Sequence, residues 1–279
     1  MVDDEAVWHY DQWLAQGKNG CMAWAGNYPD LRRDPTLLLP GAKTVVSLAM
    51  NYYPADVKRE ELPQFAYYAY GRDYHEVMRD RARQLAQFLK AETGHESRVC
   101  VDSAPMRERY WAQRAGIGFI GLNGLLIVPG KGSYFCLCEL LTTLELPPDE
   151  PCRLTCGECH ACERHCPVGA LQGGSLDARK CLSCQTIENH TPELPDWVRE
   201  ALGNRVYGCD ECQLVCPHNS QVAPTAIPEF LPNDEFMNLD LETIRNMTQA
   251  QFSRIFSHSA VKRAKLAGLQ RNAGGKVKK

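Results

Sequence analysis

Residues 155–167 read TCGECHACERHCP, and residues 209–217 read CDECQLVCP. The first stretch spaces its cysteines as Cys-x2-Cys-x2-Cys-x3-Cys-Pro, and the second repeats the end of that pattern. A cubane [4Fe–4S] cluster needs four thiolates, of which three come from a tight loop and the fourth from a distant segment. In two-cluster ferredoxins the last cysteine of each motif ligates the other cluster. The two stretches therefore predict two [4Fe–4S] clusters in a ferredoxin-like domain.

The cluster ligands follow from this crossing pattern. The second motif lacks its first closely spaced cysteine, so one ligand must come from another segment. Only Cys181 and Cys184 lie between the motifs, and the spacing leaves both open. Two zinc sites are the alternative, because Cys-x2-Cys pairs also bind tetrahedral Zn²⁺, but the closely spaced run and the proline after each fourth cysteine favour clusters. The ligands are Cys156, Cys159, Cys162 and Cys216 for one cluster, and Cys166, Cys209 and Cys212 with Cys181 or Cys184 for the other.

The composition is that of an ordinary globular protein. Of the 279 residues, 44% are hydrophobic and 23% are charged, which predicts a sizeable core. The acidic start lacks the pattern of a signal peptide, and no apolar run approaches the ~20 residues of a membrane span. We therefore expect a cytoplasmic protein whose cysteines outside the clusters are reduced thiols.

The charge is unevenly distributed along the chain. The net charge of −3 argues against binding of nucleic acid over the whole surface. Residues 262–279 nevertheless contain seven Lys or Arg residues and no acidic residue. Such a segment can contact phosphates, although the part after Arg271 is equally typical of a solvated tail.

Periodicity and turn residues predict an α+β fold in three parts. Residues 76–92 have the apolar spacing of an amphipathic helix, which Gly94 ends. A mixed α/β domain is predicted at 1–148, a two-cluster ferredoxin-like domain at 149–225, and a short helical C-terminus at 226–279. The other predicted elements are helices at 5–16, 106–115, 241–247, 248–255 and 261–269, and strands at 44–50, 98–102, 125–128 and 134–144.

Several further blocks, in the same order along the chain, resemble the epoxyqueuosine reductase family. They include residues 70–75 (YGRDYH), 101–105 (VDSAP), 176–181 (LDARKC) and 203–213 (GNRVYGCDECQ). The resemblance implies a cobalamin cofactor beside the two clusters, and it implies that Cys181 rather than Cys184 is the remaining ligand. It also implies the last step of queuosine synthesis, in which two electrons and two protons reduce an epoxide on the wobble base of tRNA to an alkene. Electrons would pass from the clusters to cobalamin.

The resemblance assigns the role of proton donor to Asp102. The residue lies at the end of a predicted strand, where a turn opens before a helix, and such positions often hold site residues. Burial under the cofactor and the base would raise the pKa of this carboxyl toward a value useful for proton donation. The alternative is that Asp102 only caps the helix that begins near Pro105.

The resemblance also implies contacts with the cofactor and with tRNA. The sequence lacks an Asp-x-His-x-x-Gly motif, because Met78 stands where the glycine is required after His75, so we predict no histidine ligand to cobalt. The expected cobalamin contacts are Asp102, Leu126, Leu137, Ser183, Cys209, Asp210, Glu211 and Cys212. The candidate tRNA contacts are Arg72, His75, Gln185, Lys262 and Arg263, with Arg107 and Arg109 as further candidates for phosphate.

Other functions share parts of this pattern. A cobalamin-dependent reductive dehalogenase has the same cofactors, but the chain lacks the twin-arginine signal common in those enzymes. A [4Fe–4S] electron-transfer module without catalysis is the alternative from another class.

Family members usually carry a strand-containing segment before this start and a helical-repeat domain after this end. We therefore interpret 1–148 as N-terminally short and 226–279 as a remnant or the start of a tRNA-binding repeat domain. The expected partners are tRNA and an external low-potential electron donor, with a monomeric enzyme and no membrane.

Overall fold

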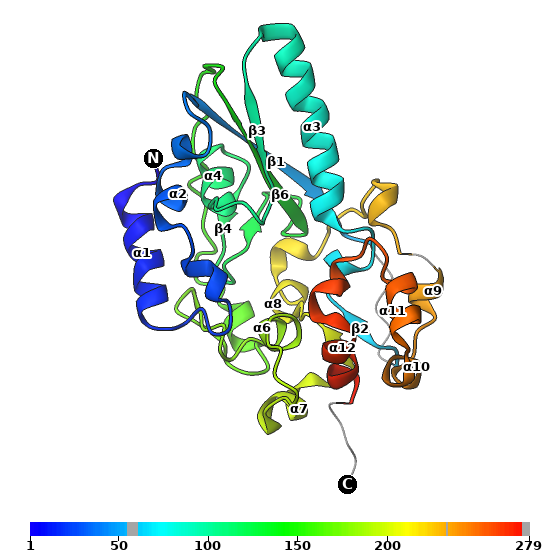
Figure 1. Ribbon diagram of the computed structural model, residues 1–279. Helices are drawn as coiled ribbons and strands as arrows, with labels where there is room; N and C mark the ends of the chain where they lie inside the picture. The colour runs from blue at the N-terminus through cyan, green and yellow to red at the C-terminus, as the bar shows by residue number, and fades with distance from the viewer. Residues whose placement is uncertain (55–60, 233, 275–279) are drawn as a thin grey trace.

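A three-stranded antiparallel sheet forms the centre of the first part of the chain (Figure 1). Its strands are β1 (Thr44–Asn51), β3 (Ser97–Cys100) and β6 (Phe135–Thr142), in the order β1-β6-β3. Thr142 pairs with Thr44 on one side and with Ser97 on the other, so the three strands are aligned at this end. The structure is a computed structural model that describes residues 1–54, 61–232 and 234–274.

Helices cover both faces of this sheet (Figure 1). On one face lies α3 (Tyr74–Thr93), and on the other α4 (Glu108–Arg114), with α1 (Asp4–Ala15) and α2 (Pro29–Arg33) beyond it. The N-cap of α3 is Asp73, and its C-cap is Gly94, whose φ of 72° suits glycine because it has no Cβ. Because helices cover both faces, β6 is buried along nearly its whole length, which explains its continuous apolar run.

The cysteine-rich part consists of short elements joined by loops. Each cysteine motif encloses a four-residue helix, and these helices, α5 and α8, pack against each other. The strand β2 (Gln64–Phe65) pairs in parallel with β9 (Arg205–Tyr207), which joins the first part of the chain to the loop of the second motif. The remaining elements are α5 (Ala161–Arg164), α6 (Leu182–Ile187), α7 (Asp196–Leu202), α8 (Glu211–Leu214) and the hairpins β4–β5 (Phe119–Ile120, Leu126–Ile127) and β7–β8 (Leu171–Gln172, Ser175–Leu176).

Gly208 shows how closely these parts approach each other. Its φ is 75°, and a Cβ at this position would lie 2.5 Å from the Cβ of Ala66. Only glycine therefore permits the chain to turn here without a clash. This turn places the second motif directly after β9.

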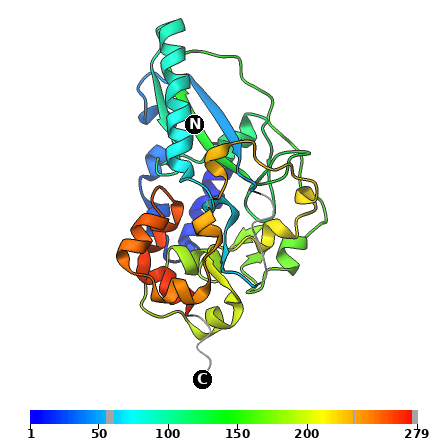
Figure 2. The ribbon, with the colours of Figure 1, turned by 90° about the vertical axis from the view of Figure 1, so that its right-hand side faces the viewer.

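The C-terminal helices lie below the start of α3, as both ribbon views show (Figures 1 and 2). The main-chain N–H of Asp73 donates to the carbonyl of His258 at 2.5 Å, which ties this region to the cap of α3. The largest hydrophobic cluster combines residues from all three predicted segments, for example Phe65, Tyr207 and Phe256. The predicted boundaries at 148 and 225 stay predictions. The helices are α9 (Asp234–Met237), α10 (Leu241–Asn246), α11 (Gln249–Ile255) and α12 (Lys265–Ala273), with a 3-10 turn at Ala260–Ala264.

The predicted α+β class and the helical C-terminus are confirmed, with two local corrections. The helix predicted at 106–115 begins only at Glu108, because a loop follows Asp102. The basic helix predicted at 261–269 is a 3-10 turn followed by α12, and Lys265 at their junction has a φ of 60°. Among the described residues, no helix is long and apolar enough to span a membrane.

The fully buried Glu139 is the exception in the apolar strand β6. Burial raises the pKa of Glu139 well above its ordinary value, and the nearby charge of Glu108 raises it further. Among the described atoms, the Oε2 of Glu139 has no hydrogen-bond partner. The folded protein thus holds this proton more tightly than the unfolded chain does. Stability is therefore lost as pH rises from the ordinary carboxyl pKa toward the raised one.

We expect Glu139→Gln to stabilise the protein more at pH 8.5 than at pH 6. The amide removes the cost of ionising a buried carboxyl, and a gain of 1 kcal/mol raises Tm by roughly 2–4 °C in a protein of this size. Thermal unfolding of the anaerobic protein, followed by circular dichroism at both pH values, measures the gain. Glu145→Gln, at an exposed residue, is the control. An equal gain at the two pH values would contradict this explanation.

Candidate cluster sites and active site

The first predicted set of cysteines lines one pocket. Cys156, Cys159 and Cys162 border it together with Cys216 from the second motif. The main-chain N–H of Leu122 points at the Sγ of Cys156 from 3.4 Å, and such contacts tune cluster potentials. The fourth cysteine of the second motif, Cys216, therefore lies with the first three cysteines of the first motif, as the ferredoxin pattern predicts. No three His, Cys, Asp or Glu side chains within the described part of the chain are placed to hold a single metal ion.

The second predicted set consists of Cys166, Cys181, Cys209 and Cys212. Burial is the main reason that the pKa of Cys209 is raised to about 11 and that of Cys212 well above its ordinary value, and the charge of Cys181 contributes to both. Cys181 in turn lies within electrostatic range of Cys166. The main-chain N–H of Ala170 donates to the Sγ of Cys166 at 3.2 Å. Cys181 thus lies within electrostatic range of each of the other three predicted ligands.

Cys184 is turned away from this set. Its side chain is buried, and its Sγ lies 3.1 Å from the Sγ of Cys21, in the segment after α1. Cys181, at the start of α6, is the one whose thiol lies near the other ligands. The geometry therefore favours Cys181 as the remaining ligand.

Asp102 lies on a loop between β3 and α4, in a left-handed conformation with a φ of 39°. A non-glycine residue in this conformation is held at some energetic cost, and such residues concentrate at functional sites. The carboxylate of Glu108, the first residue of α4, accepts the main-chain N–H of Asp102 at 2.5 Å and fixes the loop. The alternative that Asp102 caps α4 is wrong, since the N-cap is Arg107 and no side chain caps it.

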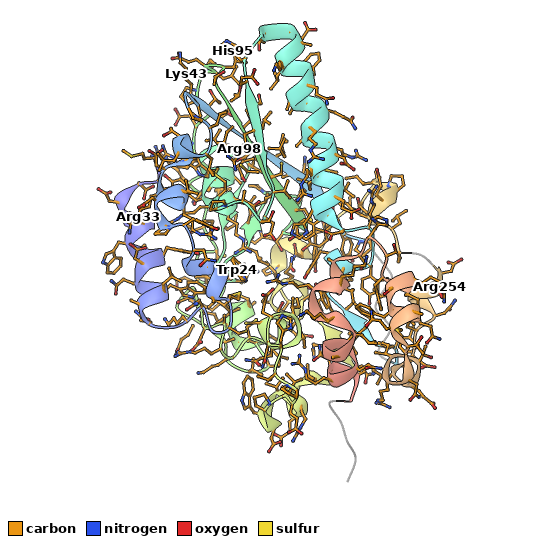
Figure 3. The ribbon with its side chains drawn as sticks, viewed as in Figure 1. Trp24, Arg33, Lys43, His95, Arg98 and Arg254 are labelled. Carbon is orange, nitrogen blue, oxygen red and sulfur yellow. The ribbon has the colours of Figure 1, made fainter. Side chains whose placement is uncertain are left out.

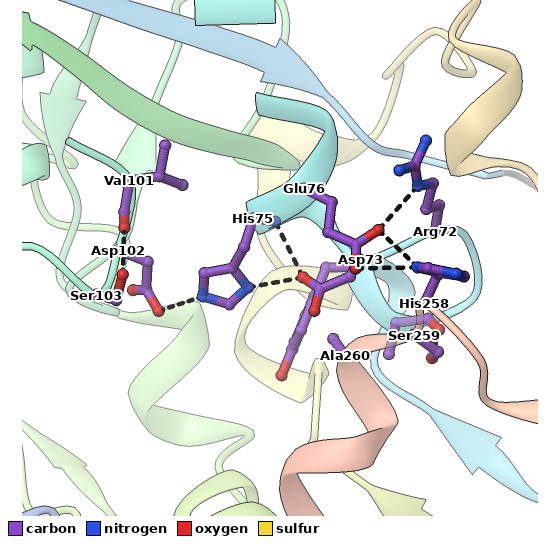
Figure 4. Close-up of polar contacts among 12 residues, drawn as sticks. Arg72, Asp73, His75, Glu76, Val101, Asp102, Ser103, His258, Ser259 and Ala260 are labelled. Carbon is purple, nitrogen blue, oxygen red and sulfur yellow. Dashed lines mark hydrogen bonds and ion pairs between the residues drawn. The ribbon is translucent and has the colours of Figure 1, made fainter. Parts of the chain in front are cut away.

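The carboxylate of Asp102 is hydrogen-bonded by two residues from the start of α3. The Nε2 of His75 lies 2.7 Å from Oδ2 of Asp102, and the hydroxyl of Tyr74 also donates to this carboxylate. On the other side of the ring, the Nδ1 of His75 lies 2.7 Å from Oδ1 of Asp73. Figure 4 shows the line of Asp73, His75 and Asp102. The side chain of Asp102 is 48% exposed, so the carboxylate faces open space as well.

These contacts set the charges of the site. Burial would raise the pKa of Asp102, but the hydrogen bonds and charge of His75, with Tyr74 and Arg109, lower it below its ordinary value. Burial would lower the pKa of His75, but its bonds to the two aspartates outweigh this and raise it to about 9. The pKa of Asp102 is thus lowered in this structure, and the increase expected under the cofactor and the base stays a prediction. At neutral pH the proton of the pair lies on the imidazole.

The residues predicted to contact the cofactor come from segments that are packed together. Leu126 and Leu137 pack in one buried cluster with Ala112 of α4, the helix that follows the loop of Asp102. The side-chain amide of Asn123 donates to the carbonyl of Cys212 at 3.4 Å, which joins the β4–β5 turn to the second motif. The main-chain N–H of Gly208 donates to Thr186 on α6, beside Ser183. These bonds join the β4–β5 turn and α6 to the second motif, and the cofactor contacts expected on these segments stay predictions.

Two of the predicted cofactor contacts have carboxylates that bind other protein groups. Asp210 is buried and accepts the main-chain N–H of Tyr67 at 2.8 Å. Glu211 forms an ion pair with Arg205. A contact with the cofactor at these two residues would therefore involve their main chain.

The predicted tRNA contacts are mostly engaged within the protein. Gln185 is buried, and both ends of its amide form internal hydrogen bonds, to Arg179 and Asn189. Arg72 pairs with Glu76 at 3.0 Å. Lys262 is exposed. A contact of Gln185 with substrate would require these internal bonds to break.

Sequence reasoning assigned no role to Asp73, which lies in the 70–75 block of the resemblance, or to Glu108, which follows the 101–105 block. Asp73 precedes a long amphipathic helix, which is the sequence signal of an N-cap. That signal predicts a cap but not a second bond to the ring of His75. No sequence pattern predicts that Glu108 would accept the N–H of Asp102 across a loop.

The fold and the two cysteine sets define a two-cluster iron–sulfur protein with a site of two carboxylates and a histidine at the start of α3. Two family models match the chain: "Epoxyqueuosine reductase QueG, DUF1730" over residues 32–103 and "4Fe-4S double cluster binding domain" over residues 155–219. An epoxyqueuosine reductase from Leadbetterella byssophila is 40% identical over 276 residues, which are 98% of this chain and 89% of that protein.

Solved structures agree with the sequence comparison. A crystal structure of epoxyqueuosine reductase with an epoxyqueuosine-modified tRNA(Tyr) stem loop matches 98% of this chain and 73% of its own, with a TM-score of 0.89 and 33% identity. The Bacillus subtilis enzyme with its catalytic aspartate loop swung out of the active site matches the same shares with a TM-score of 0.87 and 33% identity. The chain belongs to the epoxyqueuosine reductase family.

This membership decides between the earlier alternatives. The chain is an oxidoreductase of a family that modifies tRNA, with two [4Fe–4S] clusters and cobalamin as its cofactors. Zinc sites, a reductive dehalogenase and a bare electron-transfer module are therefore not supported. Both ring nitrogens of His75 face carboxylates, and the absence of a histidine ligand to cobalt stays a prediction.

We expect Cys181→Ser to lose about half of the bound iron, whereas Cys184→Ser keeps all of it. Cys181 lies near the other three ligands, and Cys184 faces Cys21. Iron and sulfide analysis of both variants after anaerobic reconstitution measures the difference. Loss of iron in Cys184→Ser with retention in Cys181→Ser would reverse the assignment.

Proposed function

We propose that this chain reduces epoxyqueuosine to queuosine in tRNA, with electrons passing from the two clusters to cobalamin and with Asp102 as the proton donor. The observation that carries the proposal is the position of Asp102, which His75 and Tyr74 hold on the loop between β3 and α4. A relative of the same fold has been crystallised with an epoxyqueuosine-modified tRNA stem loop, which supports this substrate.

The protein residues supply position and protons. Bound cobalamin would supply the low-valent reducing centre for the epoxide. Asp102 would deliver a proton to the departing oxygen, which leaves as water. An external low-potential donor would reduce the clusters, and we expect the enzyme to act as a monomer.

Movement of the Asp102 loop fits this role. In the Bacillus subtilis relative the catalytic aspartate loop is swung out of the active site. In this chain the corresponding loop is held by a few polar contacts, namely those of Asp102 with His75, Tyr74 and Glu108. A loop held in this way can release the carboxylate from His75 and present it to a substrate.

We expect Asp102→Asn to keep both clusters and cobalamin but to lose at least ~100-fold in turnover, the usual contribution of a general acid. The amide keeps the shape of the side chain but cannot donate the proton of a carboxylic acid. Single-turnover conversion of an epoxyqueuosine-bearing stem loop, followed by mass spectrometry of the nucleosides, measures the loss.

Ser103→Ala is the matched control on the same loop, since its hydroxyl donates to the carbonyl of Val101 at 3.2 Å. Activity of Asp102→Asn within threefold of the wild type would exclude Asp102 as the donor. Loss of cobalt or iron in this variant would instead identify a structural role.

A basic pair borders the same site. Arg263 pairs with Glu188 at 2.7 Å and lies within electrostatic range of Asp102. Lys262, its neighbour, is exposed. We propose that Lys262 contacts a phosphate of tRNA, while Arg263 stabilises the site through its ion pair.

We expect Lys262→Gln to weaken binding of the stem loop and to reduce the slope of log K against log salt by about one, as loss of one phosphate contact requires. Fluorescence anisotropy at several salt concentrations measures both quantities. Lys43→Gln is the control, because Lys43 lies at the far end of the sheet (Figure 3). An unchanged slope would show that Lys262 makes no such contact.

A further inference from the structure

His75 is bracketed by two carboxylates, each 2.7 Å from one of its ring nitrogens. One belongs to Asp102 on the loop after β3, and the other to Asp73 at the cap of α3. Figure 4 shows that the three side chains form a continuous line. A histidine placed in this way can pass a proton toward one carboxylate while the other fixes the orientation of its ring.

The local structure holds His75 in this orientation. The carboxylate of Asp73 accepts both the main-chain N–H of His75, at 3.0 Å, and a hydrogen bond from its ring. The ring also stacks on Tyr74, with centroids 4.1 Å apart. The main-chain N–H of Asp73 is itself bonded to the carbonyl of His258, so the cap is tied to the C-terminal region. The ring is therefore positioned before any substrate arrives.

The stoichiometry of the proposed reaction requires more protons than Asp102 can store. Removal of the epoxide oxygen as water consumes two protons, and one carboxyl group carries at most one. In this structure the Asp102 carboxylate is ionised at neutral pH, because its pKa is lowered. The neighbouring imidazole holds the proton instead. A donor that is itself ionised needs a partner that recharges it.

We propose that His75 is the proton store behind Asp102 and that Asp73 positions it. The inference rests on the proposed function and extends it. In each transfer the proton on Nε2 of His75 moves to Oδ2 of Asp102, and the resulting acid donates a proton to the substrate oxygen. Asp102 ends as a carboxylate. His75 ends as a neutral imidazole that keeps its Nδ1 proton on Asp73, and water then restores the proton on Nε2.

Other charged groups surround this line. Glu108 and Arg109 face Asp102 from the start of α4, and Glu108 has its pKa raised to about 8, mainly by burial and also by the charge of Asp102. Its carboxylate accepts the main-chain N–H of Asp102. Glu108 therefore supports the loop, whereas His75 bonds the Asp102 carboxylate itself. Arg79 acts on Asp73 from within α3.

The first test measures the charge of the histidine without any turnover. Protein carrying ¹⁵N-labelled histidine is titrated by NMR, and the spectrum of His75→Gln identifies the resonance. We expect His75 to titrate near pH 9 in the wild type, and at least one pH unit lower in both Asp102→Asn and Asp73→Asn. An ordinary histidine pKa in the wild type, or no change in the variants, would overturn the proposal.

The second test measures the pH profile of single turnover at saturating substrate. Wild-type activity should fall only as His75 loses its proton, whereas in His75→Gln the decline should move to lower pH, where Asp102 alone must hold the proton. The loss at pH 8 should be at least about tenfold and should shrink toward pH 6. Added imidazole should restore part of the activity of His75→Ala but none to Asp102→Asn.

The controls separate this inference from the proposed function. His95→Gln, far from the site (Figure 3), should keep the wild-type profile. A wild-type protein that never converts epoxyqueuosine would refute the proposed function. A wild type that converts it, with His75→Gln showing an unchanged alkaline decline, would refute only the proton store. If His75→Gln fails to bind its cofactors, the NMR titration of the wild type and Asp102→Asn still decides the question.

Discussion

The two cysteine motifs exchange their fourth ligands, and this exchange constrains the rest of the fold. Cys216 lies with the first set, and Cys166 lies with the second. Two loops that are about 50 residues apart in sequence must therefore lie face to face, which α5 and α8 achieve by packing together. The loop of Cys209 is then fixed through its neighbours β2 and α6 and through Asn123 of the β4–β5 turn. In this way the cluster region and the sheet domain become one packed unit.

The active site is built where these constraints meet. The start of α3 carries Asp73, Tyr74 and His75, and its cap is tied to the carbonyl of His258. The loop after β3 brings Asp102 to this helix start, and Glu108 holds the loop in its left-handed conformation. Asp102 and His75 lie close together in a partly buried site, so each stabilises the charged form of the other. The pKa of Asp102 is therefore lowered and that of His75 is raised. The proton therefore rests on His75 rather than on Asp102.

Buried carboxyl groups extend beneath the site. Glu108 and Glu139 repel each other's charge and are poorly solvated, so the folded protein favours their neutral forms. Such groups reduce stability at alkaline pH. The neutral forms of Glu108 and Glu139 also limit the negative charge around Asp102. Asp102 already faces the carboxylate of Asp73 across the imidazole ring of His75. The arrangement leaves the imidazolium of His75 as the group that balances both aspartates.

The sequence by itself determined the two clusters, because the spacing of cluster ligands within each motif does not depend on long-range contacts. It also predicted the central strands, from their apolar runs, and α3, from the spacing of the apolar residues on its buried face. The resemblance singled out Asp102 and Cys181. The tertiary structure decided the contacts that join separate segments: Cys184 facing Cys21, Glu108 holding the Asp102 loop, and His75 between two carboxylates. Their partners lie up to 163 residues apart, and the pKa of each group depends on those partners, which no local pattern specifies.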